Sequence, residues 1–408
     1  MTRGLMKSTS CFAIAAAAGL FATSAMAADL GGNCCADLEE RVAELEATAA
    51  RKGNRKVSLT VYGQVNQAII WHDDEYGYRE GKLTVRDNSA STSRFGFRGE
   101  AQIRPDLTAG YVIEIGLDDM DFSIYGDKAF MVRHNYAYLS SSTFGRLAVG
   151  QTSQATDGLY EINLANTVTT PGGMDEHAFV LNPALAAFFS PGFDGSRRQG
   201  IYYSTPTLAG FVLSAGYAHN TQSGQAGYEA EDSDTYYDIA LRYAGEFNGV
   251  RVAFGVGYRK TDDDGGNDVD TYIASGSVMH TPTGLFVSAG YAKSEYDVND
   301  FDIESESDDT ISITNTLDRR GFWVTAGIEK NWFGVGATTL YGEYNWVEYD
   351  ALQLGDVDGS YWGLGAVQKI DAAATDLYLQ FRKYEMDLPF NVPFDEAKVV
   401  TGGMRIQF

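Results

Sequence analysis

The sequence predicts an all-β fold: a 16-stranded antiparallel transmembrane β-barrel with a short N-terminal α-helical, coiled-coil-like segment. From Val57 onward, apolar and polar residues alternate with a period of two, which gives each strand one apolar and one polar face. The 408 residues also include 45 glycines, 25 tyrosines and 22 phenylalanines. Such a composition favours many strands joined by tight turns over a helical bundle.

The first 27 residues have the pattern of a cleaved secretory signal. Arg3 and Lys7 are basic, residues 11–22 are apolar, and Ala25-Met26-Ala27 has the small residues of a cleavage site. No later run of 18 apolar residues predicts a spanning helix. We therefore expect an exported protein that would enter a membrane only through its strands.

Residues 28–56 are expected to form a periplasmic helical segment. Leu38, Val42, Leu45 and Ala49 recur at spacings typical of a coiled-coil seam. Two heptads are too short to be stable alone in water, so the apolar seam needs a partner surface. That surface could belong to other copies of the chain, as in a trimerisation segment or periplasmic peg, or to the chain's own barrel.

Residues 57–408 are predicted to form the barrel. The strand at 92–104 shows the pattern most clearly, with Phe95 and Phe97 on one face and Arg94 and Arg98 on the other. The sixteen predicted strands are 57–72, 92–104, 107–115, 130–139, 145–151, 198–205, 211–218, 235–243, 250–259, 271–280, 285–293, 321–329, 337–345, 360–369, 375–382 and 398–408.

A secreted β-sandwich is the main alternative, because its strands alternate in the same way. The connections argue against it, since tight turns alternate with long acidic loops, as in outer-membrane barrels. The predicted long loops are 73–89, 152–197, 219–234, 294–318 and 346–359. The polar faces also carry more charges than a sandwich core could bury without partners, whereas the wet lumen of a wide barrel accepts them.

Aromatic residues on the predicted apolar faces should form girdles at the two membrane interfaces. They are Trp71, Tyr111, Tyr136, Tyr203, Tyr217, Tyr243, Tyr258, Tyr291 and Phe408.

Charge and motif spacing exclude several functions. The net charge of −24 argues against nucleic-acid binding, which needs clustered Lys and Arg. The five histidines are scattered without metal-ligand spacing, and no nucleophile lies in a recognisable hydrolase pattern. We therefore expect no enzymatic activity, no metal and no cofactor.

Several strings resemble known porins. Ser93-Arg94-Phe95-Gly96-Phe97-Arg98-Gly99 is similar to the second strand of general bacterial porins, and the end at Phe408 is similar to their C-terminal assembly signal. The runs 34–40, 280–285 and 368–379 resemble alphaproteobacterial porins of the rhizobial and Brucella type.

This resemblance implies a homotrimer of 16-stranded channels for passive diffusion of small hydrophilic solutes across the outer membrane. It implies contacts with outer-membrane lipid and lipopolysaccharide, and recognition by the barrel assembly machinery through the C-terminal strand. It also implies that the third external loop, here 152–197, folds into the lumen and sets a constriction.

Acids on that loop facing arginines on the wall would create a transverse field in the pore. The candidate loop acids are Asp157, Glu161, Asp175 and Glu176. The candidate wall residues, all on polar faces by alternation, are Arg94, Arg98, Glu114, Arg133, Arg198, Arg251, Glu343 and Arg382.

Two other functions stay open. A substrate-selective channel, for sugars or organic anions, would carry an aromatic track, and Tyr62, Tyr202 and Tyr378 are predicted to face inward. A non-conducting barrel for adhesion or envelope attachment would suit the N-terminal helix. Ion preference is also open, because the acidic net charge favours cations at the mouth while wall arginines favour anions inside.

Overall fold

A computed structural model describes residues 56–74, 82–117, 130–167, 189, 192–219, 234–262, 268–304, 310–351, 355–387 and 396–408. Residues 56–408 form one compact unit. The expected signal at 1–27 and the expected helix at 28–56 lie outside the described residues, apart from residue 56. Within the described ranges, no helix is long and apolar enough to cross a membrane.

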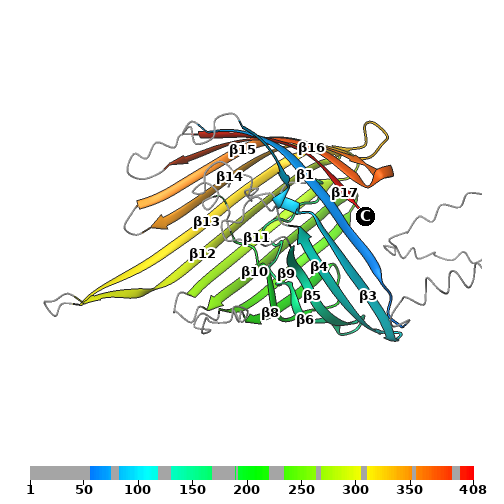
Figure 1. The fold of residues 1–408 in the computed structure, drawn as a ribbon, viewed down its shortest axis with the longest axis horizontal. Helices are drawn as coiled ribbons and strands as arrows, with labels where there is room; N and C mark the ends of the chain where they lie inside the picture. The colour runs from blue at the N-terminus through cyan, green and yellow to red at the C-terminus, as the bar shows by residue number, and fades with distance from the viewer. Residues whose placement is uncertain are drawn as a thin grey trace, which may run out of the picture. The chain divides into compact units, whose positions relative to one another are not determined.

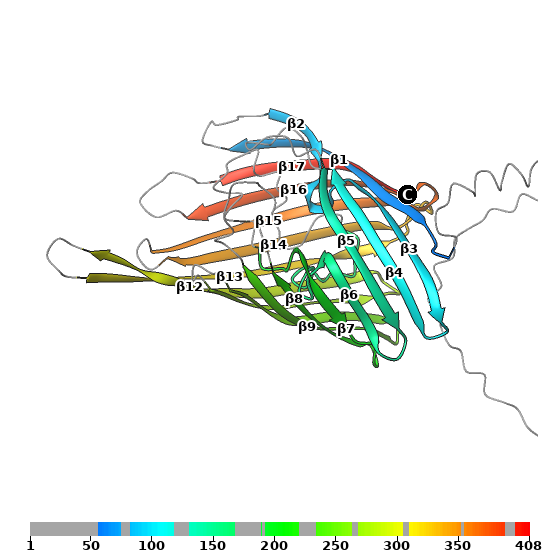
Figure 2. The same ribbon diagram turned by 60° about the horizontal axis from the view of Figure 1, so that its bottom comes forward.

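The unit is one closed antiparallel sheet (Figures 1 and 2). The strands of its first half are β1 Thr60–Asp74, β2 Lys82–Asp87, β3 Arg94–Arg104, β4 Leu107–Leu117, β5 Phe130–Ser141, β6 Gly145–Ser153, β7 Arg197–Ser204, β8 Phe211–His219 and β9 Thr235–Phe247. Those of its second half are β10 Val250–Asp262, β11 Asp268–His280, β12 Leu285–Glu304, β13 Thr310–Lys330, β14 Thr338–Ala351, β15 Gly355–Ile370, β16 Thr375–Asp387 and β17 Glu396–Gln407.

These 17 segments fill 16 positions around the barrel, because β2 and β3 share one edge of β1. β2 pairs with the stretch of β1 from Gln67 to His72, and β3 pairs with the stretch from Thr60 to Gln64. A short 3-10 helix, η1 Ser89–Ser91, separates them. The other edge of β1 pairs with β17, which closes the sheet. The predicted 16-stranded antiparallel barrel is confirmed.

Three predicted long loops are wrong in extent. The loop predicted at 73–89 contains β2. Most of the loop predicted at 294–318 continues β12 and β13, which pair as far as Glu304 and Thr310 and reach beyond their neighbours in Figure 2. The loop predicted at 346–359 is likewise mostly the ends of β14 and β15. Acidic residues outside the membrane zone obscure the alternation, but backbone pairing continues there because it does not require an apolar face.

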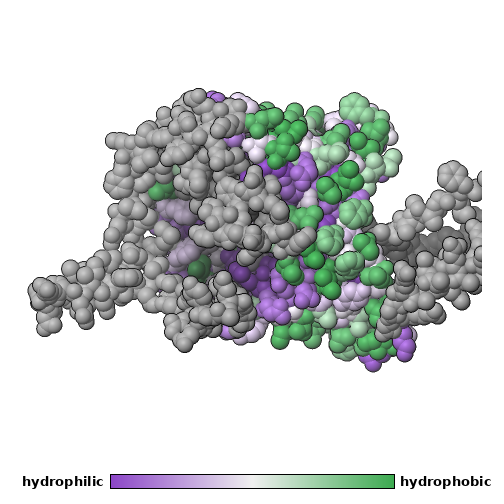
Figure 3. Space-filling view, viewed as in Figure 1, coloured by the Kyte–Doolittle hydropathy of each residue, from purple (hydrophilic) through white to green (hydrophobic). Residues whose placement is uncertain are grey.

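The faces of the strands alternate as predicted. On β1, Val61, Val65 and Ile69 are exposed on the outer face, whereas Gln64 and Asn66 are buried on the inner face. Figure 3 shows hydrophobic residues gathered on the outside of the barrel toward the right of the view, near the ends of strands joined by short turns. An apolar exterior around a polar interior is the pattern that a lipid environment requires.

One predicted girdle residue, Tyr136, faces inward. β4 and β5 lose register at one point: Glu114 pairs with His134, but the adjacent Ile115 pairs with Val132. The extra residue, Arg133, forms a β-bulge, after which the parity of β5 is reversed. Tyr136 therefore points into the lumen, where its hydroxyl accepts a hydrogen bond from Arg146 Nη2 at 3.1 Å.

Candidate pore constriction

The connection between β6 and β7 runs along the inside of the barrel. The first described part of it, 154–167, bonds to polar side chains on the strands of the inner wall. The Thr156 amide donates to Asp238 Oδ2 on β9 at 2.7 Å. The Leu164 amide donates to Ser277 Oγ on β11 at 3.0 Å. The loop thus uses wall side chains in place of the backbone partners that a strand would have.

Asn166 carries the loop to the far strands of the wall. Its amide nitrogen donates to Glu329 Oε2 on β13 at 2.8 Å, and its side chain donates to Asp376 Oδ1 on β16 at 2.9 Å. Arg405 on β17 pairs with the same aspartate, with Nη2 2.7 Å from Oδ2, and this nitrogen also donates to Asn166 Oδ1 at 3.5 Å. The contacts of the described loop therefore extend from β9 to β17.

Two arginines hold the loop backbone. Arg242 on β9 donates to the carbonyl oxygens of Ala155 at 2.6 Å and Asp157 at 2.7 Å. Arg259 on β10 donates to the carbonyl oxygen of Gly192 at 2.9 Å on the returning limb of the loop. A guanidinium presents several donors in one rigid plane, so each of these arginines can fix a loop segment that has no helix or sheet of its own.

An apolar cluster packs the loop against β9 to β13. Leu159, Tyr160 and Phe193 from the loop are almost fully buried, together with Trp323 on β13. The Trp323 Nε1 donates to the Tyr160 carbonyl oxygen at 2.8 Å, so the indole gives both packing and a hydrogen bond. The loop is anchored by burial of apolar surface as well as by polar contacts.

Asp194 lies next to this cluster on the returning limb. Its Oδ1 accepts a hydrogen bond from the Tyr160 amide at 2.6 Å. Burial raises the pKa of the Asp194 carboxyl to about 7, with the charge of Asp157 acting in the same direction and that of Arg259 opposing it. Burial also raises the pKa of the Tyr160 hydroxyl.

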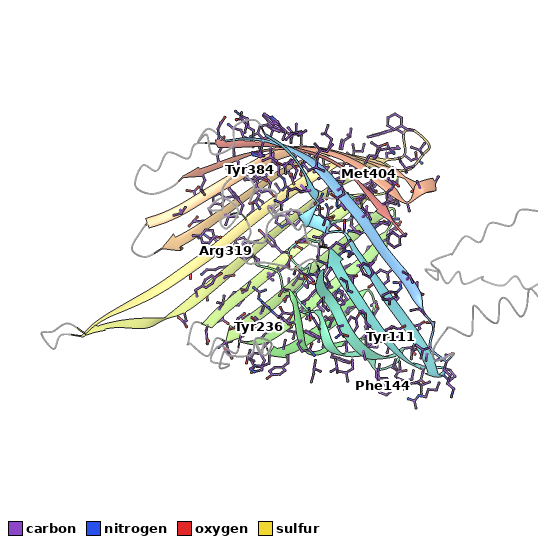
Figure 4. All side chains as sticks on the ribbon, viewed as in Figure 1. Tyr111, Phe144, Tyr236, Arg319, Tyr384 and Met404 are labelled. Carbon is purple, nitrogen blue, oxygen red and sulfur yellow. The ribbon has the colours of Figure 1, made fainter. Side chains whose placement is uncertain are left out.

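Phe189 is the one described residue of an apolar stretch, 179–189, in this loop. It is 1% exposed and packs against Tyr361 on β15 and Tyr384 on β16, with ring centroids 6.0 and 5.3 Å away. Tyr384 is labelled in Figure 4. The rest of the stretch, 179–188, lies outside the described residues, as do the candidate acids Asp175 and Glu176.

A charged cluster occupies β3, β4 and β5. At its centre is Glu114, whose carboxylate lies 2.7 Å from Arg133 Nε and 3.9 Å from Arg94 Nη1. The hydroxyl of Tyr62 on β1 donates to Glu114 Oε2 at 3.0 Å. Three of the predicted wall residues thus come together here, with two positive charges and one negative.

Loop acids lie near this cluster. The charges of Asp157 and Glu161 act on the guanidinium of Arg197, at the start of β7, and Arg133 acts on the same group. Asp157 also acts electrostatically on His134. Glu161 is exposed to solvent and Asp157 is half-buried. The arrangement brings opposite charges to one region of the lumen.

Two further predicted wall residues stack on tyrosines. Arg98 is exposed, with its guanidinium carbon 5.2 Å from the ring centroid of Tyr62. Arg198 on β7 lies over Tyr236 on β9 at 4.5 Å. Both arginines lie on inward faces, as predicted.

The remaining three predicted wall residues, Arg251, Glu343 and Arg382, occupy different environments. Arg251 lies beside the β9–β10 turn in an exposed pair with Glu246, with Nε and Oε2 3.2 Å apart. Arg382 and Glu343 pair at 2.7 Å, and their side chains are only 2% and 3% exposed. This last pair belongs to the inner wall but is shut off from solvent.

Some residues of the site escaped the sequence analysis. Alternation places Arg259 on the same face of β10 as Arg251, so strand parity alone could have predicted Arg259 as a wall residue. Asp194 and Asn166 lie in an irregular loop without periodicity, and only the folded chain shows their partners.

Comparisons with known proteins agree with this architecture. The sequence matches the family model described as Gram-negative porin over residues 13–387. A comparison with curated protein sequences finds no match.

Solved structures show the same fold at low sequence identity. A loop-deletion form of OmpT from Vibrio cholerae is 16% identical, with 86% of this chain and 100% of that one covered and a TM-score of 0.59. An anion-selective porin from Comamonas acidovorans is 18% identical, with 86% and 100% covered and a TM-score of 0.57. OmpF from Salmonella typhi, solved with daunomycin, is 17% identical, with 86% and 98% covered and a TM-score of 0.54.

The family match covers most of the sequence, and the closed barrel with an apolar exterior is the fold expected of that family. The chain therefore belongs to the Gram-negative porin family, and it is a non-enzymatic channel of the outer membrane.

Proposed function

We propose that this porin is a general-diffusion channel, which lets small hydrophilic solutes and ions cross the outer membrane passively. The observation that carries the proposal is the position of the loop between β6 and β7. Its described contacts lie on β9 to β17, whereas the cluster of Glu114, Arg133 and Arg94 lies on β3 to β5. A loop held against one side of the lumen would narrow the passage without closing it.

The passage is proposed to run between the loop acids and the arginine wall. Asp157 and Glu161 would supply the negative side, and Arg94, Arg133 and Arg197 the positive side. A transverse field of this kind orients dipolar solutes and disfavours apolar ones. Arg98 and Arg198 extend the positive side, and Asp175 and Glu176 remain candidates on the same loop.

We further propose that the channel is a homotrimer. The resemblance of the sequence to trimeric porins supports this, and OmpT of Vibrio cholerae, which shares the fold, has been solved in a trimer form. The C-terminal Phe408 is proposed as the assembly signal. Its amide and carbonyl groups bond to Gly63 at 3.0 and 2.9 Å, at the seam where β1 and β17 close the barrel, and its ring is exposed on the outside. Outer-membrane lipid and lipopolysaccharide are the proposed surroundings.

Liposome swelling with uncharged sugars of increasing size tests general diffusion. The swelling rate should fall smoothly with solute size, without preference for one sugar. Swelling by a single sugar class would favour a selective channel instead. No swelling from a folded, heat-modifiable oligomer would contradict the proposal and favour an adhesion or attachment barrel. In planar bilayers, conductance steps that close in threes would support the trimer, and single steps would contradict it.

A further inference from the structure

Four inward-facing tyrosines form a stripe on β5, β7 and β9. Tyr136 and Tyr138 pack against a buried cluster that contains Tyr202 and Tyr236 together with Ala148 and Ala218. The rings of Tyr136 and Tyr138 are 6.1 Å apart, and both side chains keep part of their surface exposed. We call Tyr136, Tyr138, Tyr202 and Tyr236 the tyrosine stripe. Tyr202 was predicted to face inward, and Tyr136 was wrongly predicted to face outward because the bulge at Arg133 reverses the parity of β5.

Arginines stack on both ends of the stripe. At the end near the β5–β6 turn, the guanidinium carbon of Arg146 lies 3.8 Å from the ring centroid of Tyr138 and 5.6 Å from that of Tyr136. At the other end, Arg198 lies 4.5 Å from the centroid of Tyr236, which is labelled in Figure 4. Each guanidinium is held in place by ring contact, and both arginines keep part of their surface exposed.

The nearby acids make the Arg146 end the better site for an anion. Near the β9 end, the Tyr236 hydroxyl donates to Asp234 at 2.5 Å, and Asp238 acts electrostatically on Tyr202. Near Arg146, the acid that acts on Tyr138 is Glu100, while Arg98 adds a second positive charge there. The positive charges therefore outnumber the negative ones at this end.

Building on the proposed channel, we propose that the tyrosine stripe with Arg146 is a binding track for planar aromatic carboxylates. A guanidinium pairs with a carboxylate through parallel hydrogen bonds, and tyrosine rings stack on a flat ring. An uncharged sugar would use the rings but not the charge, and a small aliphatic acid would use the charge but not the rings. The combination favours a solute with both features.

Block of single-channel KCl conductance tests the track. Benzoate should reduce conductance at a concentration about fivefold lower than cyclohexanecarboxylate, which matches its charge and size but lacks a flat π-face. Equal block by the two acids would overturn the proposal, as would stronger block by maltose. A preparation with no KCl conductance would contradict the channel itself, whereas an open channel that benzoate blocks no better than its control contradicts only the track.

Variants locate the site. Arg146→Gln should raise the half-blocking concentration of benzoate about tenfold, because it removes the charge from the stack. Tyr138→Leu should raise the half-blocking concentration of benzoate by a smaller factor. It should also reduce the difference between the half-blocking concentrations of benzoate and cyclohexanecarboxylate. Arg104→Gln is the matched control: Arg104 lies at the β3–β4 turn in an exposed pair with Asp106, and its loss should leave the block unchanged. Unchanged block in Arg146→Gln and Tyr138→Leu would overturn the proposal.

Discussion

Individual ion pairs in this barrel differ greatly in how much they contribute to the stability of the fold. Arg382 and Glu343 are almost fully buried, and the carboxylate also accepts a hydrogen bond from Gln380 Nε2 at 2.7 Å. Arg251 and Glu246 are about half exposed at a turn. Water screens the exposed pair, whereas removing either buried partner takes the closest opposite charge from a group that stays buried.

Glu343→Ala should therefore lower the free energy of unfolding by about 3–5 kcal/mol, because it leaves the Arg382 charge buried. Glu246→Ala is the control and should change it by less than about 1 kcal/mol. Urea unfolding of the folded barrel, followed by tryptophan fluorescence, measures both. Equal effects of the two variants would contradict the distinction between a sealed and an exposed pair.

Asp194 makes the docking of the β6–β7 loop against the inner wall depend on pH, and the direction of this dependence can be predicted. Its pKa rises from 3.8 in an exposed carboxyl to about 7 in the docked loop, mainly through burial, with Asp157 and Arg259 as its charged neighbours. Docking thus takes up a proton, so the docked state is most stable at low pH and becomes less stable as pH rises through this window.

Hydrogen exchange at the Tyr160 amide, which donates to Asp194, measures this effect. After correction for intrinsic exchange, protection should fall as pH rises from about 4 to about 7 and then level off. Asp194→Asn should flatten the profile. Protection that increases with pH in the wild-type protein would contradict the predicted direction of the pH dependence.

At the scale of elements, glycines on the inner wall make room for the loop. A Cβ atom added at Gly257 on β10 would lie 2.4 Å from Leu159 Cδ2, and one added at Gly255 would lie 2.4 Å from Leu159 Cδ1. On β13, a Cβ at Gly321 would lie 2.6 Å from the Phe193 ring. Successive inward positions without side chains thus form the socket for the apolar cluster of the loop.

Gly257→Val should displace Leu159 and loosen the loop, since it fills this socket with side-chain atoms. We expect a larger and noisier single-channel conductance. Gly402→Ala is the control, because a Cβ there meets Leu379 at an ordinary 3.5 Å. Unchanged conductance in a folded Gly257→Val channel would argue that the loop does not limit the passage.

Strand positions could be predicted because the membrane imposes a two-residue period that local sequence carries directly. The parity of β5 could not, because the tyrosines on its inner face, Tyr136 and Tyr138, obscure the change of parity at Arg133. β2 was missed because it has only six residues, and the alternation of Leu83 and Val85 with polar neighbours is too short a run to stand out beside a 3-10 helix. The wall arginines followed from strand parity, but the partners of Asn166 depend on the path of an irregular loop across the lumen.

At the scale of the whole molecule, charge is distributed unevenly. The chain is strongly acidic, with 55 Asp and Glu against 31 Lys and Arg, yet Arg94, Arg133 and Arg197 gather at one level of the lumen. The acidic net charge should attract cations to the mouths, and the arginines should favour anions in the passage. The loop acids Asp157 and Glu161 then set the balance between the preference for cations and the preference for anions.

The reversal potential in a KCl gradient tests this account most directly. The double variant Asp157→Asn/Glu161→Gln should shift it toward the chloride equilibrium potential, because the acids facing the arginines are gone. The control Asp106→Asn/Asp371→Asn removes the same charge from exposed turn residues and should shift it much less. If the loop variant left the reversal potential where the control leaves it, the passage would not run between the loop acids and the arginine wall.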